Sequence, residues 1–168
     1  MSKGSWLRIH KKQLIIHSLI VVAFLLFLFF LAELLLDRFE RISGESNLYE
    51  TELPAATNNI QYWVGQFQFN KGALEIKGWA FIQGQDSLNN EKYIVLKSAD
   101  RTYVFTTKTM IKRDVTQLFG DQGLNLDYSG FRALIPLRKV VSGEYTVGIY
   151  IKKDDIEALQ YTNEVADF

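Results

Sequence analysis

The sequence contains no cysteine, which excludes disulfide bonds, thiolate chemistry and zinc sites built on cysteine. Both histidines, His10 and His17, lie near the N-terminus, so the rest of the chain has no imidazole for catalysis or for binding a metal. No group of carboxylates has the spacing of a calcium loop. Five carboxylates have the residue type of a glycosidase acid but not the spacing: Glu75, Asp86, Glu91, Asp114 and Asp127. We therefore predict no enzymatic activity, no cofactor and no bound metal.

Charge is scarce at the N-terminus. Four basic residues, Lys3, Arg8, Lys11 and Lys12, are the only charged residues before Glu33, and the remainder of the chain has more acidic than basic residues. Proteins that bind nucleic acid carry a basic face, so this balance argues against a nucleic-acid partner. An exported domain without disulfides depends on its hydrophobic core alone, which fits a Gram-positive bacterial surface better than a eukaryotic secretory route.

A long hydrophobic run occupies residues 14–36, and Glu33 is its single formal charge. A helix of this length is roughly 34 Å long, enough to cross a hydrocarbon core of about 30 Å. A soluble helix would need a polar face, which residues 19–32 do not provide. We therefore predict a transmembrane helix over residues 14–36.

The basic residues before this run predict its orientation. They place residues 1–13 in the cytoplasm as a short tail, because acidic and basic residues cancel directly after the run. The run is longer than the apolar region of a cleavable signal peptide, and bulky residues follow Ala32 where a cleavage site needs small ones. We expect an uncleaved signal-anchor in the cell membrane, with the C-terminal part of the chain outside the cell.

Glu33 lies near the outer end of the predicted span, and two interpretations remain open for it. Its side chain can reach the membrane interface, as charged side chains near helix ends do. Alternatively, it pairs with a basic or polar group of another membrane protein.

Residues 37–59 are predicted to contain the end of the helix and a linker. Ser43 and Gly44 provide a stop signal for the helix, and Pro54 is typical of a linker.

From residue 60 the pattern changes to short apolar runs separated by turn residues. The sequence Asn70-Lys71-Gly72 predicts a hairpin turn, and Gly78 predicts a β-bulge. Residues 115–119 suggest one helical turn capped by Asp114. Residues 60–168 are therefore predicted to form an all-β extracellular domain, an antiparallel β-sandwich of about seven strands. The expected strands are 63–69, 73–82, 93–97, 102–107, 130–137, 145–151 and 157–162.

Aromatic side chains crowd the first half of this predicted domain. In a sandwich about half of them face the core, and the others can stack on sugar rings or contact a protein. Trp79 and Phe81 share one face of a strand and Ala80 and Ile82 share the other, so we expect one of these apolar faces to be covered. The candidates for glycan or partner contact are Trp63, Trp79 and Tyr93.

Three short motifs occur in order in the predicted domain: Gly78-Trp79-Ala80, Arg113-Asp114-Val115 and Ser129-Gly130-Phe131. A strand with Leu137, Gly143, Tyr145, Val147, Gly148 and Ile149 follows them. This order resembles a small β-sandwich module found beside or within bacterial glycosyltransferases and surface-polysaccharide assembly proteins. It also resembles the short membrane-anchored accessory proteins of Gram-positive cell-wall polysaccharide clusters, of lactococcal and streptococcal type. The resemblance covers residues 76–151 and brings no catalytic residue with it.

The resemblance implies a non-catalytic accessory subunit that binds a polytopic membrane glycosyltransferase and helps assemble or modify cell-surface polysaccharide. Two alternatives stay open: a stand-alone membrane-anchored carbohydrate-binding module, and a regulatory bitopic protein that docks other envelope proteins. Arg113 and Asp114 either tie a crossover loop to the sheet or contact a glycan or partner. An exposed Trp63 or Trp79 beside polar groups would favour sugar binding, whereas a flat apolar patch continuous with the helix face near Glu33 would favour a protein partner.

Overall fold

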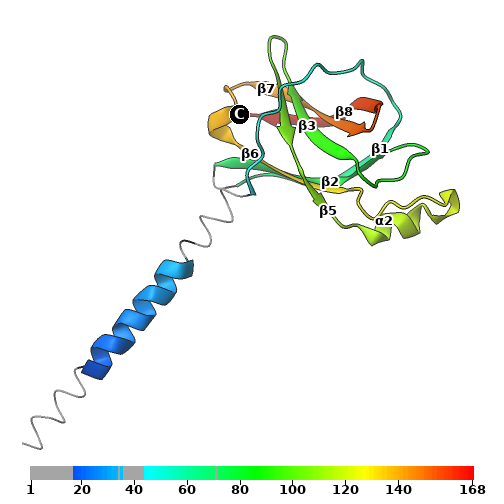
Figure 1. Cartoon of the computed structure of the whole chain (residues 1–168). Coiled ribbons are helices and arrows are strands. Elements are labelled where there is room, and N and C mark those ends of the chain that lie inside the picture. The colour runs from blue at the N-terminus through cyan, green and yellow to red at the C-terminus, as the bar shows by residue number, and fades with distance from the viewer. Residues whose placement is uncertain (1–16, 34, 36–43, 71) are drawn as a thin grey trace, which may run out of the picture. The chain divides into compact units, whose positions relative to one another are not determined.

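The computed structural model describes residues 17–33, 35, 44–70 and 72–168, and the chain divides into two compact units after Ser43. In the first unit the described residues form a helix (Figure 1). Among the described residues, no helix has both the length and the apolar character needed to cross a membrane. The predicted cytoplasmic tail and the two ends of the predicted span lie outside the described residues.

The second unit, Gly44–Phe168, contains eight strands in two antiparallel four-stranded sheets that pack face to face (Figure 1). The first sheet has the order β1 (Ile60–Asn70), β2 (Ala73–Ile82), β6 (Gly130–Pro136) and β5 (Lys108–Met110). The second has the order β4 (Thr102–Thr106), β3 (Glu91–Lys97), β7 (Glu144–Lys153) and β8 (Ile156–Asp167). The helices of this unit are α2 (Arg113–Leu118) and the 3₁₀ helices Gly120–Gln122 and Leu137–Lys139. The prediction of an all-β antiparallel domain is confirmed.

The alternation of apolar residues places the strands correctly. Strand β2 has the predicted bounds, β4 and β6 end one residue before the predicted ends, and the other predicted strands extend beyond theirs. Strand β5 is not among the predicted strands and brings their number to eight. Its three residues carry no alternating pattern, and it forms because β6 offers it backbone partners.

The main hydrophobic core lies between the two sheets. Leu74, Ile76 and Ile135 enter it from the first sheet, and Ile94 and Ile149 enter it from the second. Two smaller clusters lie on the outer faces, one on each sheet. All three clusters belong to residues 44–168, as do both sheets, so this unit has a hydrophobic core of its own, as a domain that folds independently does.

Residues 44–59, predicted as a linker, instead lie along the domain; we call this segment the strap. Its Ser46 bonds through its backbone N–H to the Leu134 carbonyl of β6 at 2.8 Å, and Tyr49 bonds to the Val104 carbonyl of β4 at 2.8 Å. Farther along, the Thr57 N–H donates to the Leu159 carbonyl of β8. The strap therefore crosses the second sheet from one edge strand to the other, because backbone groups there are available for pairing.

The strap also covers the apolar outer face of the second sheet. Its Tyr49 ring stacks on Tyr93 with 4.5 Å between ring centroids, and its Leu53 packs against the same cluster. The first sheet is covered differently: Trp79 and Phe81 pack against Val115 of α2 and the neighbouring Phe119. The expectation that one of the two apolar faces of the Trp79 strand would be covered is therefore confirmed.

Two local predictions were wrong. The β-bulge lies at Gly65 of β1, between the pairs Val64–Gly78 and Gln66–Lys77, whereas Gly78 on the opposite strand keeps its register. Asp114 does not cap α2, because the N-cap position is Lys112 and it makes no side-chain capping bond. Asp114 occupies the first turn instead, where a carboxylate interacts favourably with the helix dipole.

Candidate functional site

The outer face of the first sheet carries the most exposed aromatic ring at a strand centre, that of Trp63. This side chain is 54% exposed. The bulge at Gly65 makes room for it, because a Cβ atom at Gly65 would lie 2.1 Å from the indole. The glycine therefore holds the ring against the backbone, and the ring presents a fixed apolar surface to solvent.

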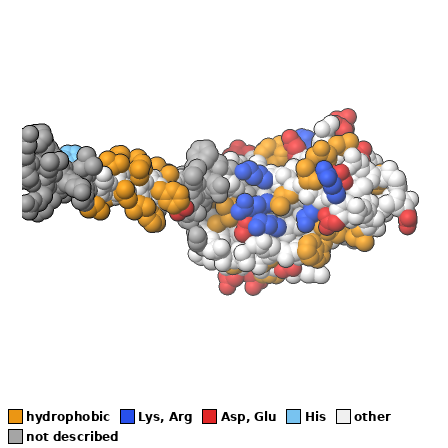
Figure 2. Space-filling model, turned by 90° about the horizontal axis from the view of Figure 1, so that it is seen from below, with side chains coloured by type: hydrophobic (Ala, Val, Ile, Leu, Met, Phe, Trp, Pro, Cys, Tyr) orange, Lys and Arg blue, Asp and Glu red, His pale blue; other side chains and the backbone are white. Residues whose placement is uncertain are grey.

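Side chains on this face form two adjacent rows across the four strands. The register aligns Trp63 with Trp79, Trp79 with Gly130, and Gly130 with Met110, so these positions form the aromatic row. In the next row, Gln66 lies opposite Lys77, Lys77 opposite Arg132, and Arg132 opposite Lys108. We call the second row the polar row. Figure 2, which views the domain from the side of β2, β5 and α2, shows basic side chains gathered beside hydrophobic ones on this face.

A shallow hollow of about 210 Å³ lies where the two rows meet. Gly130 contributes to its shape, since a side chain there would come within 2.7 Å of the Lys112 Cγ atom. The aliphatic stem of Lys112 therefore lies over Gly130, and Lys112 lines the hollow. The hollow is smaller than a typical drug-sized pocket, so it can hold only part of an extended ligand. Its lining residues are Trp63, Gly65, Gln66, Lys77, Gly78, Met110 and Lys112.

Glu75 lies beside the polar row on the same face of β2, two residues before Lys77. Its side chain is buried, and it accepts hydrogen bonds from Arg132 Nε at 2.7 Å and from Gln66 Nε2 at 3.0 Å. Lys77 Nζ lies 2.9 Å from the same carboxylate. Burial alone would raise the pKa of Glu75, but the bonds from Lys77 and Arg132 outweigh burial and lower this pKa. Glu75 is therefore ionised at neutral pH and fixes the orientation of Arg132 and Lys77.

Two other predicted contact residues, Trp79 and Tyr93, pack against aromatic rings of the domain itself. Trp79 is half-buried, because its ring packs on Phe81 at 5.8 Å and against Phe119 at 5.6 Å between ring centroids. Tyr93 is buried between Tyr49 and Tyr150, and its hydroxyl donates to Glu91 at 2.7 Å. Tyr93 therefore offers no free face for a ligand, and Trp79 is only partly accessible.

The remaining predicted contacts are exposed but isolated. Arg113 and Asp114 lie on the solvent side of α2, and neither side chain forms a hydrogen bond or ion pair with a described residue. The predicted tie between this pair and the sheet is therefore absent among the described residues. Glu33 is exposed in the helix of the first unit. Of the six predicted contact residues, only Trp63 lies in the hollow.

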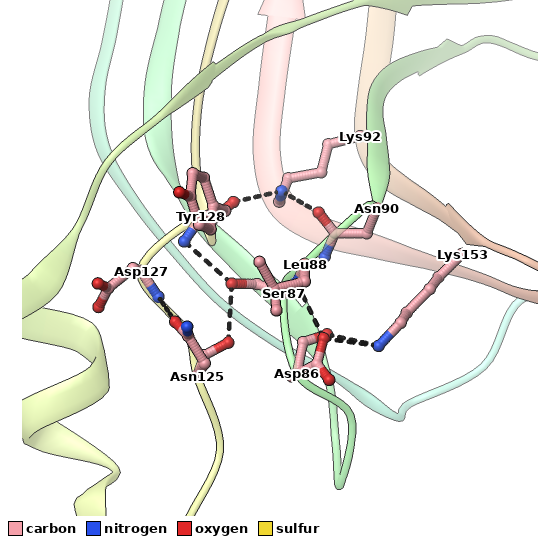
Figure 3. Close-up of polar contacts among 9 residues, drawn as sticks. All are labelled: Asp86, Ser87, Leu88, Asn90, Lys92, Asn125, Asp127, Tyr128 and Lys153. Carbon is pink, nitrogen blue, oxygen red and sulfur yellow. Dashed lines mark hydrogen bonds and ion pairs between the residues drawn. The ribbon is translucent and has the colours of Figure 1, made fainter.

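A second polar cluster joins the loop after β2 to the loop before β6 (Figure 3). Lys92 is 4% exposed, and its amine donates to the Tyr128 carbonyl at 2.7 Å and to Asn90 Oδ1. The Ser87 hydroxyl donates to the Asn125 carbonyl and accepts from the Tyr128 N–H. Because these groups bond to one another, the cluster fixes two loops and presents no free group to a ligand.

The carboxylates named from the sequence are dispersed over the domain. Asp86 pairs with Lys153 at 2.7 Å, and Asp127 accepts from the Thr116 hydroxyl at 2.6 Å. Within the described part of the chain, no group of three or more His, Cys, Asp or Glu residues is placed to hold a metal ion.

A larger hollow of about 540 Å³ lies between the strap and β4. The aromatic rings that line it, Tyr49 and Tyr103, are already packed against Tyr93 and Tyr145. The face around Trp63 is therefore the better candidate site, because its ring is available.

Sequence reasoning found Trp63 but missed the polar row beside it. Glu75 was named only as a carboxylate, and Arg132 and Lys108 were not singled out. The alternation in β2 places Glu75 and Lys77 on the same face as Trp79, which was an available signal. The alignment of Arg132 and Lys108 with them depends on pairing between distant strands. The chain matches no known family model, and no curated protein or solved structure shows detectable similarity to it.

Proposed function

We propose that this protein is a non-catalytic, membrane-anchored protein of the cell surface that binds polysaccharide through the face around Trp63. The observation that carries the proposal is the exposed indole of Trp63, held on Gly65 and bordered by the polar row. The C–H face of a sugar ring packs on an aromatic ring, and neighbouring amide and charged groups hydrogen-bond to its hydroxyls. A flat ring beside hydrogen-bonding groups is the arrangement that such a ligand requires.

Membrane anchoring is supported by the hydrophobic run at residues 14–36 and the basic residues before it. In this proposal the N-terminus is cytoplasmic and residues 44–168 are extracellular. The domain then holds glycan at the membrane surface, where lipid-linked polysaccharide is assembled.

The partner in this proposal is a polytopic membrane glycosyltransferase that performs the chemistry while this chain holds the glycan. The motifs at Gly78, Arg113 and Ser129 support this role through their resemblance to polysaccharide-assembly proteins. The exposed pair Arg113 and Asp114 on α2 does not line the hollow and is available for contact with that partner. The same Trp63 face would also serve a stand-alone carbohydrate-binding module, so the partner requires its own test.

Glycan binding is tested by measuring the affinity of the full-length protein in uncharged detergent for a panel of bacterial wall polysaccharides. The Trp63→Ala change removes the stacking surface, and we expect at least a tenfold loss of affinity, about 1.4 kcal/mol or more. Tyr128→Ala is the matched control, because Tyr128 is an exposed aromatic residue whose hydrogen bonds involve its backbone. Equal affinity of the Trp63→Ala protein and the unaltered protein would refute the proposed site.

The partner is tested by recovering the tagged full-length protein from membranes in mild detergent and identifying the proteins that accompany it. We expect a multi-span glycosyltransferase, lost when residues 14–36 are exchanged for an unrelated span. Recovery of no such enzyme, with glycan binding intact, would favour the stand-alone module.

A further inference from the structure

The polar row contains three cationic side chains that lie directly opposite one another on adjacent strands: Lys77, Arg132 and Lys108. Side chains directly opposite each other in antiparallel strands have Cβ atoms about 5 Å apart, and like charges there are destabilising. Lys112 adds a fourth cation at the edge of the hollow. This concentration is local, because the chain beyond residue 12 has more acidic than basic residues.

Glu75 offsets only part of this charge. Its single carboxylate bonds to Lys77 and to the Nε atom of Arg132. No other carboxylate in the described part of the chain forms an ion pair with Lys77, Arg132, Lys108 or Lys112. The face therefore keeps an excess of positive charge.

Several hydrogen-bond donors on this face have no acceptor among the described residues. Arg132 donates to Glu75 through Nε, and no described residue accepts a hydrogen bond from its terminal Nη1 or Nη2 groups. The amines of Lys108 and Lys112 likewise have no acceptor among the described residues. A guanidinium that is fixed through Nε and free at its terminal nitrogens is oriented to bind an oxyanion.

We propose that the ligand of the Trp63 face is an anionic glycan, in which a sugar ring packs on Trp63 while a phosphate or carboxylate group is bound by Arg132, Lys108 and Lys112. This inference rests on the proposed glycan binding and names the class of ligand. The geometry supports it because the aromatic and polar rows are adjacent and share the hollow. A neutral glycan would leave the unpaired cations without a role.

The test compares three ligands with the same sugar backbone: dextran, carboxymethyl dextran and dextran phosphate. Binding to residues 44–168 is measured at low salt by calorimetry and repeated at high salt, because screening weakens exposed charge interactions. We expect at least one charged dextran to bind ten times more tightly than dextran, and the tighter of the two identifies the oxyanion. Vesicles of equimolar phosphatidylglycerol and phosphatidylcholine test a membrane surface as the source of the anion.

The variants Lys108→Gln and Lys112→Gln remove charge without touching Glu75, so the fold is preserved. We expect each to weaken binding of the charged dextran about fivefold and to weaken binding of dextran much less. Lys97→Gln is the matched control, since it removes an exposed lysine from the second sheet. Arg132→Gln should have a larger effect, about tenfold or more, because it removes both terminal nitrogens of the guanidinium together with its charge.

The outcomes separate this inference from the proposed function. Equal binding of all three dextrans, weakened by Trp63→Ala but not by the lysine changes, would overturn the anionic ligand and leave glycan binding intact. Binding of the vesicles but of no dextran would overturn both. Preference for a charged dextran that depends on Lys108, Lys112 and Trp63 together would support both.

Discussion

The buried amine of Lys92 predicts an unusual dependence of stability on pH. Burial lowers the pKa of Lys92 to about 8, because the charged amine lies inside the cluster of Figure 3 without a carboxylate partner. In the unfolded chain a lysine keeps its proton up to about pH 10.4. Between these two values the unfolded chain binds more protons than the folded one, so the free energy of unfolding increases as pH rises.

The magnitude follows from the two pKa values. A difference of one bound proton changes the free energy of unfolding by at most about 1.4 kcal/mol per pH unit. Between pH 7 and pH 9.5 the free energy of unfolding therefore increases by about 2 kcal/mol. The increase in stability ends near pH 9.5, because buried tyrosines change the stability in the opposite direction. Burial raises the pKa of Tyr150 to about 12, so above pH 10 the unfolded chain loses tyrosine protons first and stability falls.

The assay is urea unfolding of residues 44–168 across this pH range, followed by the fluorescence of Trp63 and Trp79. Lys92→Met keeps the size of the side chain and removes the titrating group, so we expect its stability to be flat from pH 7 to pH 9.5. Lys97→Met removes an exposed lysine and should follow the unaltered protein. Parallel pH profiles for the unaltered protein and the Lys92→Met protein would refute the reasoning.

Three further changes test other parts of the structure. Ser46→Ala removes the hydroxyl that accepts a hydrogen bond from the Leu134 N–H at 2.9 Å. The N–H is then unpaired, and the free energy of unfolding measured in urea should fall by about 1–3 kcal/mol. Ser142→Ala, at an exposed site, should leave this free energy almost unchanged. Tyr49→Ala removes the ring that stacks on Tyr93, and we expect a loss of about 2 kcal/mol with faster hydrogen exchange in β4; unchanged exchange would argue against the strap as a structural element. Gly65→Ala places a methyl group where the Trp63 ring lies, so glycan affinity should fall at least fivefold, while Gly120→Ala, with open space around it, should bind normally.

The strands were predictable because their signal is local. The turn residues before Ala73 and the apolar run that follows predict β2 with its observed bounds, and both signals lie within a dozen residues of sequence. The strap was not predictable in this way. It is held by bonds such as that between Thr57 and Leu159, which lie about a hundred residues apart, and its own residues have the polar character of a linker.

The candidate site depends on one inserted residue. Strict alternation from Trp63 would turn Gln66 towards the core and Phe67 towards solvent. The bulge at Gly65 reverses both, so Gln66 lies beside Lys77 and Phe67 packs against the core. A glycine in a strand suggests a bulge but does not say which of two neighbouring strands carries it, and here Gly65 of β1 carries it while Gly78 of β2 pairs regularly with Val64.

The strap also determines how the domain would respond to mechanical tension. A force applied on the N-terminal side of Gly44 acts first on the Glu45–Arg138 ion pair and on the hydrogen bonds between Ser46 and β6. It acts next on the hydrogen bonds of Asn47 and Tyr49 to β4. These attachments join the two sheets at one end of the strap, so the load is divided between the sheets and does not fall on a single terminal strand. With the proposed membrane anchor and polysaccharide ligand, the strap would yield before either sheet does, and the Trp63 face on β1 and β2 would keep its shape under load.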